Sequence, residues 1–239
     1  MTTVVNGHIS SEVLASELRN LDGLDREVDI VEGLERVVTS ARTLFAVDGA
    51  GLLWLDASGD VRYLTASDER GRVLEVVQEE LGVGPCVDTL LRGVEVESTD
   101  LQGDPRWPEV GKRLAPYAIR AVLGIPIRIG GATVAALNVL AQDVHDWDDS
   151  EIAALRSLAA VIETVLASGL LAQRHEQVIE QLQYALDHRV VVERAIGLLM
   201  GRHDIDPVEA FNLLRGVSRR ERRKAAEVAD DLLAGRLRL

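Results

Sequence analysis

The sequence predicts an α+β protein in which an antiparallel sheet with helices gathered on one side precedes a long helix and a small three-helix bundle. Three observations lead to this prediction. Between residues 30 and 81 the apolar positions change from helical spacing to short strand-like runs and back. Residues 125–129 and 132–140 are apolar runs around Gly130 and Gly131, which suit a tight hairpin turn. From residue 148 to residue 203 no proline occurs, and the apolar spacing stays helical.

The elements of the first domain, predicted to span residues 30–170, follow in order from local patterns. Residues 1–29 are polar and acidic and are predicted to be a lead-in segment. Residues 30–45 repeat apolar positions three and four apart, as an amphipathic helix does. Residues 51–55 and 61–64 are predicted to pair as strands around a turn at 56–60. A second helix is expected over 72–81, ending at the glycines that precede Pro85.

The long helical region continues into the predicted bundle, as far as residue 203. Residues 171–187 are predicted to be a helical linker, and one stripe along it forms a seam of Leu171, His175, Val178, Leu182, Ala185 and Arg189. Two copies of the chain would pair along this seam as a coiled coil, although its polar members weaken it. The alternative is a single amphipathic helix folded back on its own sheet. We favour the pairing, and therefore a homodimer, because the region far exceeds an ordinary helix of about 11 residues.

The last part, residues 188–235, is predicted to form three helices with clear boundaries. Asp206, Pro207 and Glu209 mark a helix N-terminus, because they supply an N-cap, a first-turn proline and an early acid. Ser218 and Glu221 are spaced as a capping box, which predicts that the last helix begins there. Gly235 is expected to end that helix.

Composition limits the classes of function. With 239 residues, 47% of them hydrophobic, the chain can build one or two packed domains. A single cysteine excludes an internal disulfide and a paired-cysteine metal site, and the 5 histidines lack metal-ligand spacing. The N-terminus lacks the pattern of a secretory signal, and no run of about 18 apolar residues indicates a membrane span. We expect a cytoplasmic protein without a membrane or a metal site.

Charge is divided unevenly along the chain. The net charge of -13 lies entirely before residue 176, whereas the remaining residues carry 11 basic and 11 acidic side chains. Within that neutral tail, five of six consecutive positions are basic; we call this group the basic cluster, and it consists of Arg219, Arg220, Arg222, Arg223 and Lys224. Such a group favours a polyanion as partner. The alternative is a solvated face that Glu227 and Asp230 partly neutralise.

The position predicted for the basic cluster adds to the functional interpretation. At the start of a helix, positive charge opposes the macrodipole, at a cost of about 0.3–1 kcal/mol for each charge. The charge split also suggests that the cluster folds back on the acidic first domain, which would be a simple form of autoinhibition.

The tail resembles an ANTAR domain, the RNA-binding output module of bacterial antitermination regulators. The resemblance rests on residues 195–200 (AIGLLM), Ala210 with Phe211, and Leu214 with Arg215, followed by Ser218, Lys224, Val228 and Ala229. Two positions depart from the family. Ile196 stands where the family usually has a lysine, and Arg222 stands where it has an asparagine. The loss of that lysine affects RNA affinity or target choice, and Arg222 is a candidate for compensation.

The preceding region resembles a GAF sensor domain of the actinobacterial type. The matching segments are residues 66–69 (ASDE), 82–88 (GVGPCVD), 104–108 (DPRWP), 124–126 (GIP) and 136–139 (ALNV). The resemblance implies that this domain senses a signal and binds a small-molecule ligand, without indicating which ligand or cofactor. GAF followed by ANTAR is a known arrangement in that group.

The sequence predicts two sets of site residues. The RNA-binding residues are expected to be Arg189, Arg202, Arg215, Ser218, Arg219, Arg220, Arg222, Arg223 and Lys224. Cys86 and Trp107 are candidates for the sensor pocket. A lone cysteine, however, is more often a small buried hydrophobic residue, and a tryptophan beside proline is as often a loop anchor.

We therefore predict a signal-responsive antitermination regulator, a dimer that grips tandem stem-loops in nascent mRNA. The alternative is a ligand-sensing dimer whose output is protein contact and whose ANTAR-like tail has lost RNA binding, as Ile196 suggests. DNA binding is less favoured, because no second helix is basic enough to read a major groove. No motif of a hydrolase, kinase or dinucleotide-binding enzyme occurs, so no catalytic residue is assigned and an enzyme is not expected.

Overall fold

The computed structural model describes residues 4–5, 8–21, 29–56, 60–171 and 177–239. Its centre is a five-stranded antiparallel sheet in the order β4-β3-β7-β6-β5. The strands are β3 (Gly49–Leu55), β4 (Val61–Ala66), β5 (Val96–Ser98), β6 (Ala121–Ile129) and β7 (Ala132–Ala141). A short hairpin, β1 (Val4–Val5) with β2 (His8–Ile9), and helix α1 (Ser11–Asn20) precede it. We call residues 29–171 the sheet domain.

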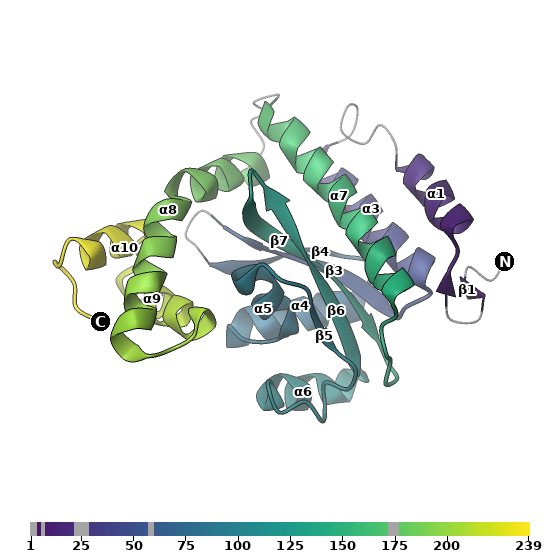
Figure 1. Cartoon of the computed structure of the whole chain (residues 1–239), viewed down its shortest axis with the longest axis horizontal. Helices are drawn as coiled ribbons and strands as arrows, with labels where there is room; N and C mark the ends of the chain where they lie inside the picture. The colour runs from purple at the N-terminus through teal and green to yellow at the C-terminus, as the bar shows by residue number, and fades with distance from the viewer. Residues whose placement is uncertain (1–3, 6–7, 22–28, 57–59, 172–176) are drawn as a thin grey trace.

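Helices cover both faces of the sheet. Helices α3 (Ile30–Phe45) and α7 (Asp149–Leu171) lie on one face, and α4 (Glu69–Leu81), α5 (Pro85–Arg92) and α6 (Pro108–Leu114) lie on the other (Figure 1). The prediction that helices gather on one side was therefore wrong. Neighbouring side chains point to opposite faces of a strand, so Leu52 joins the core under α3 while Leu53 joins the core under α4. Both faces are apolar, and both need a cover.

Most of the predicted local elements are confirmed. Helix α3 has the predicted bounds, and the Asp29 carboxylate caps it by accepting hydrogen bonds from two backbone amides. The hairpin of β6 and β7 turns at Gly130 and Gly131, whose φ angles of 58° and 83° are positive. Sequence patterns missed α5, β5, α6 and the short 3-10 helix at Ala115–Tyr117. These pieces are too short to show a period, and α5 begins at a proline that the sequence suggested was a helix end.

Helix α7 is long and apolar enough to cross a membrane by length and composition alone. In this fold it is a core helix, because Leu155, Leu158 and Ile162 are fully buried against the sheet and α3. The place of α7 in the core of the sheet domain explains why the helix is so apolar.

Three helices form the C-terminal bundle, as predicted: α8 (Gln177–His203), α9 (Pro207–Glu221) and α10 (Ala225–Leu233). They share a core that includes Leu199, Leu214 and Val228, each fully buried. Asp206 caps α9 in a full capping box with Glu209, which confirms the predicted helix start. Helix α10 ends at Leu233, two residues before Gly235 with its positive φ of 68°.

The predicted coiled-coil seam is not a free stripe in this structure. Leu182 is 1% exposed and, with Ile179, packs into the core under α3 and α7. At the other end, Leu171 is 86% exposed. His175 and the side chains of Val178 and Ala185 lie outside the described residues. Part of the seam is therefore used inside the chain, as in the alternative of a helix folded back on its own sheet.

The predicted capping box at Ser218 and Glu221 is wrong. Both residues lie inside α9, and the Ser218 hydroxyl donates to the carbonyl of Arg223. Helix α9 ends when Arg222 adopts a left-handed φ of 55°, and α10 begins one residue after Lys224. Arg219, Arg220 and Arg222 thus occupy the C-terminal end of α9, where positive charge is favoured, whereas Lys224 is the N-cap of α10. The predicted opposition to the macrodipole is therefore wrong for these three arginines, and it no longer supports a functional interpretation of the cluster.

Candidate nucleic-acid interface

The C-terminal bundle packs directly against the sheet domain (Figure 1). Helix α9 contacts α5, and the Phe211 side chain, only 2% exposed, belongs to the same apolar cluster as the sheet face beneath α4 and α5. Ile196 on α8 contacts that cluster and the core of the bundle as well. Apolar side chains therefore join the core of the bundle to the core of the sheet domain.

An ion-pair cluster around Asp60 lies beside this apolar contact. The Asp60 carboxylate Oδ1 receives Arg215 Nε at 2.9 Å and Arg219 Nε at 3.1 Å. Arg215 also donates to the backbone carbonyl of Glu79 at 3.0 Å. The Arg215 side chain is 6% exposed and that of Asp60 is 9% exposed. Burial lowers the pKa of the Arg215 guanidinium, and Asp60 opposes that change by stabilising the charged form.

Two polar contacts lie at the rim of the same interface. The Asn212 side-chain amide donates to the Gly82 carbonyl at 2.9 Å. Arg92, at the end of α5, pairs with Asp206 at 2.7 Å in a more exposed position. Phe211, Asn212, Arg215 and Arg219 thus form one face of α9, which we call the docking face. Its members follow a spacing of about four residues, because that spacing returns to the same side of a helix.

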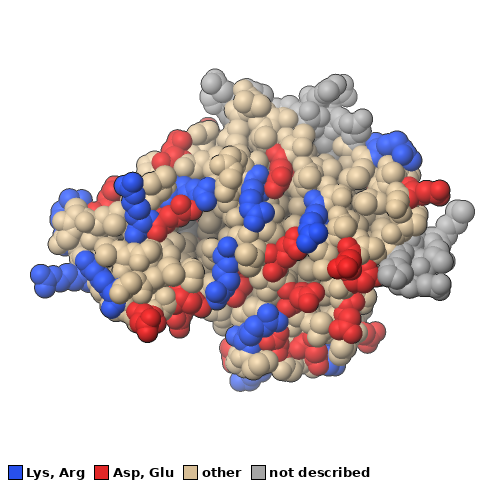
Figure 2. Space-filling model, in the orientation of Figure 1, with Lys and Arg blue, Asp and Glu red and all other residues tan. Residues whose placement is uncertain are grey.

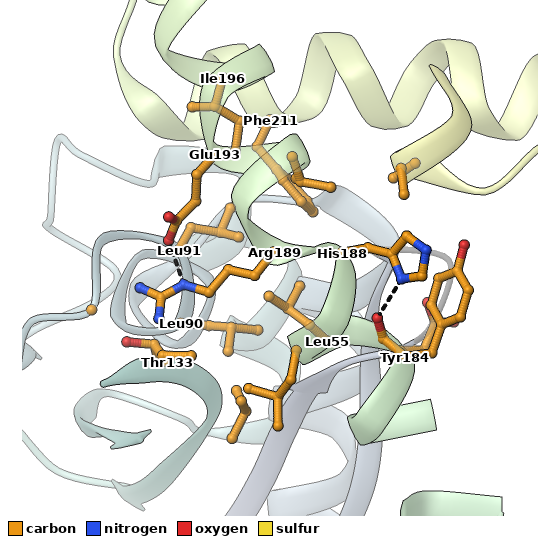
Figure 3. A pocket seen from close by; sticks show the side chains of 18 of the residues that line it. Leu55, Leu90, Leu91, Thr133, Tyr184, His188, Arg189, Glu193, Ile196 and Phe211 are labelled. Carbon is orange, nitrogen blue, oxygen red and sulfur yellow. Dashed lines mark hydrogen bonds and ion pairs between the residues drawn. The ribbon is translucent and has the colours of Figure 1, made fainter. Parts of the chain in front are cut away.

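A cavity of about 210 Å³ lies between the bundle and the sheet domain (Figure 3). Leu55, Leu90 and Leu91 line it from the sheet domain, and Ile196 and Phe211 face them from the bundle. Several of its polar members have partners: Arg189 Nε donates to Glu193, and the ring of His188 contacts the Tyr184 carbonyl at 2.9 Å. The cavity is thus bounded by both parts of the chain and changes shape if they separate.

The predicted RNA-binding residues fall into two groups. Several are engaged within the chain: Arg215 and Arg219 by Asp60, Arg189 by Glu193, Arg223 by Glu221, Glu227 and Asp231, Ser218 by the Arg223 carbonyl, and Lys224 by the Tyr184 ring at 3.7 Å. Three others, Arg202, Arg220 and Arg222, are exposed and have no ion pair among the described residues. Figure 2 shows basic and acidic side chains interspersed over this view of the molecule.

The exposed arginines do not all lie together. Arg220 and Arg222 stand at the end of α9, where the chain turns into α10. Arg202 precedes the start of α9, at the opposite end of a 15-residue helix, roughly 20 Å away at 1.5 Å per residue. The structure therefore places Arg220 and Arg222 together at the α9–α10 turn and separates Arg202 from them.

Cys86 and Trp107 are both buried in the sheet domain, but they have different neighbours. Cys86 Sγ accepts a hydrogen bond from Gln78 at 2.9 Å, and burial raises the pKa of its thiol well above the ordinary value. The thiol is therefore neutral, as expected of a small buried residue. Trp107 is 5% exposed, and the Arg106 guanidinium lies 4.1 Å from its ring centre. Their role in a sensor pocket stays a prediction.

Sequence reasoning missed the residues that hold the two parts of the chain together. Asp60 was interpreted only as the end of a turn, and Asn212 attracted no attention. It also missed a buried polar pair beneath α4, in which Asn138 donates to the Glu75 carboxyl at 2.8 Å. Within the described residues no group of three or more His, Cys, Asp or Glu side chains is arranged to hold a metal ion.

Comparison with protein-family models identifies both parts of the chain. A GAF domain model matches residues 29–166, more than half of the chain, and an ANTAR domain model matches residues 180–233. The ANTAR match includes the basic cluster and the docking face, and the GAF match includes Asp60. A search of curated proteins gives no match.

Solved structures resemble the sheet domain. Free methionine-R-sulfoxide reductase from Neisseria meningitidis, in complex with its substrate, is 15% identical with a TM-score of 0.55, over 72% of this chain and 99% of that one. The GAF domain of a phosphoenolpyruvate-protein phosphotransferase from Coxiella burnetii is 19% identical with a TM-score of 0.53, over 67% of this chain and 96% of that one. At these identities the likeness shows the fold alone. The chain belongs to the GAF domain family, and it joins this sensor domain to an ANTAR domain, an RNA-binding antitermination output module.

Proposed function

We propose that this chain is a cytoplasmic, non-enzymatic regulator that grips tandem stem-loops in nascent mRNA as a homodimer and prevents transcription termination in response to a signal. The observation that carries the proposal is the basic cluster at the α9–α10 turn of the ANTAR domain. There Arg220 and Arg222 are exposed and, among the described residues, free of ion pairs. Guanidinium groups so placed can pair with phosphates or stack on unpaired bases of a loop.

The homodimer is supported by apolar side chains that the single chain leaves exposed. Leu171 at the end of α7 is 86% exposed, and Val190 on α8 is 54% exposed. Leu171 lies at the end of the sheet domain, and Val190 lies on the first helix of the ANTAR domain. A second copy that covers them would bring two ANTAR domains together, as two neighbouring stem-loops require. We also propose that the GAF domain is of the actinobacterial type.

The RNA contact is tested by removing the two free arginines together. We expect Arg220→Ala with Arg222→Ala to weaken binding to a library of tandem stem-loop RNAs and to lower the dependence of affinity on salt. Each lost phosphate contact should reduce the slope of log affinity against log salt by about 0.7–0.9. Lys112→Ala is the matched control, because that side chain is 79% exposed on the sheet domain. An unchanged slope in the double variant would show that the cluster is a solvated face.

One observation favours the alternative, in which the output is protein contact. Ile196, where the family usually has a lysine, packs between the sheet-domain cluster and the core of the bundle. The Ile196 side chain thus contributes to the contact between the two domains, and it carries no charge that could bind RNA. Arg222, where the family has an asparagine, supplies a charge elsewhere on the domain, at the end of α9.

The role of Ile196 is tested by two substitutions in parallel. Ile196→Gln loosens the apolar contact without adding charge, whereas Ile196→Lys loosens it and restores an ammonium group. We expect both variants to bind the RNA library to a similar extent if the basic cluster carries recognition. RNA binding that occurs only in the lysine variant would show that the native ANTAR domain has lost RNA binding, and the protein-contact function would replace our proposal.

A further inference from the structure

We propose that Asp60 is an autoinhibitory anchor that occupies Arg215 and Arg219 in the place of an RNA phosphate, so that docking of the ANTAR domain on the sensor domain weakens RNA binding by competing for these two arginines. This inference rests on the proposed function and adds its regulation. It identifies a specific carboxylate of the sensor domain as the competitor of the nucleic acid.

The chemistry of the contact is that of an arginine–phosphate pair. A carboxylate offers guanidinium groups the same kind of charged oxygen acceptor that a phosphate does. Asp60 Oδ1 receives the Nε atoms of Arg215 and Arg219 at 2.9 and 3.1 Å, and both arginines are predicted RNA contacts. One buried acid of the sensor domain thus neutralises two of the charges that RNA would use.

Asp60 is fixed to the sensor domain, so it cannot follow the ANTAR domain when that domain leaves. Its backbone amide donates to Asp56 at 2.9 Å, and Arg62 Nη2 lies 3.3 Å from Asp60 Oδ2. Arg62 in turn pairs with Glu79 on α4 at 3.1 Å. The carboxylate therefore stays with the sheet, and separation of the domains exposes Arg215 and leaves both Arg215 and Arg219 without their partner.

Burial of Arg215 also keeps RNA from reaching it. Arg215 is 5% exposed, and Phe211, on the same face of α9, is 2% exposed. A stem-loop cannot reach Arg215 while these side chains are covered, whereas Arg219, whose side chain is 44% exposed, is withheld only by its ion pair with Asp60. In contrast, Arg220 and Arg222 remain exposed in the docked form. The docked chain therefore keeps part of its positive surface and should bind RNA weakly through that part alone.

The test measures RNA binding and domain docking separately in the full chain. Asp60→Asn removes the charge that holds the two arginines while keeping the size of the side chain. We expect its affinity for the tandem stem-loop library to exceed that of the native protein at least about tenfold, because more of the chain is competent to bind. Amide hydrogen exchange in α9 and at the end of α4 should rise at the same time. Glu69→Gln is the matched control, since it removes the same charge from an exposed acid that pairs with Arg72.

A second variant loosens the docking without touching Asp60 or any predicted RNA contact. Arg92→Gln with Asn212→Ala removes the two rim contacts, and it should also raise both RNA affinity and exchange in α9. Faster exchange with RNA affinity equal to that of the native protein, in both variants, would overturn the autoinhibition while leaving the proposed function in place. Absence of RNA binding from the native protein and from both released variants would overturn the proposed function, and the autoinhibition with it.

Discussion

Replacing Glu75 by glutamine should make the protein more stable at pH 8 than the native chain, by an amount on the order of 4 kcal/mol in the free energy of unfolding. Glu75 is fully buried between α4 and the sheet, and its carboxyl has two side-chain partners, Asn138, which donates to it at 2.8 Å, and the Cys86 thiol. Its oxygen Oε2 has no hydrogen-bond partner among the described residues. Burial raises the pKa of Glu75 from an ordinary 4.5 to about 8. A carboxylate in this place is poorly solvated, so the folded protein favours the protonated acid.

The raised pKa of Glu75 determines whether the protein gains or loses stability as the pH rises. The folded protein holds the proton of Glu75 more tightly than the unfolded chain does. Below pH 4.5 both states are protonated, and the group has no effect on stability. As the pH rises from about 4.5 to 8 the unfolded chain releases its proton first, so the native protein loses stability progressively over this window. Glutamine keeps the acceptor for Asn138 and does not titrate.

The measurement is urea unfolding of both proteins at pH values from 4.5 to 8.5. The difference between native protein and Glu75→Gln isolates Glu75 from other groups that titrate, including Asp88, whose pKa burial also raises. Glu69→Gln serves as control, because Arg72 lowers the pKa of that exposed acid, so its titration lies at and below the acidic end of the window and the profile above that end should be unchanged. A difference between native and Glu75→Gln proteins that stays constant with pH would show that Glu75 has an ordinary pKa when buried.

The sequence predicted elements whose signal is local and missed arrangements that depend on distant contacts. Helix α3 could be assigned residue by residue, because one face of it is buried and the other is not. The central strands are different: Leu52 and Leu53 are both fully buried, on opposite faces. Such an apolar run shows that a strand is buried but does not show how many helices cover it. The second layer of helices was missed for this reason.

The position of the basic cluster also depended on contacts that the sequence does not show. Ser218 and Glu221 have the spacing of a capping box, yet α9 continues through both because Leu214 and Val217 extend its buried face. The sequence shows which residues form the cluster, but it predicted their place in the helices wrongly. Asp60 could not be identified at all, since it lies 155 residues from Arg215 and its importance comes only from that partner.

Replacing Phe211 by alanine should separate the unfolding of the ANTAR domain from that of the sensor domain. Phe211 is 2% exposed, and it joins the apolar cluster of the sensor domain although it belongs to α9. Loss of a buried phenylalanine costs about 3–5 kcal/mol, and here that loss falls on the contact between the two domains. Two domains that stabilise each other through this contact unfold together; without it, each follows its own stability.

The distribution of tryptophan makes this separation measurable in one sample. All 3 tryptophans, at positions 54, 107 and 147, lie in the sensor domain, so their fluorescence follows that domain alone. Circular dichroism also follows the helices of the ANTAR domain. The two signals should coincide during urea unfolding of the native protein and should separate in Phe211→Ala. Leu213→Ala is the matched control, because that side chain is 45% exposed on the same helix and should leave the two curves together. Coincident curves in Phe211→Ala would show that the polar contacts around Asp60 couple the domains without the aromatic ring.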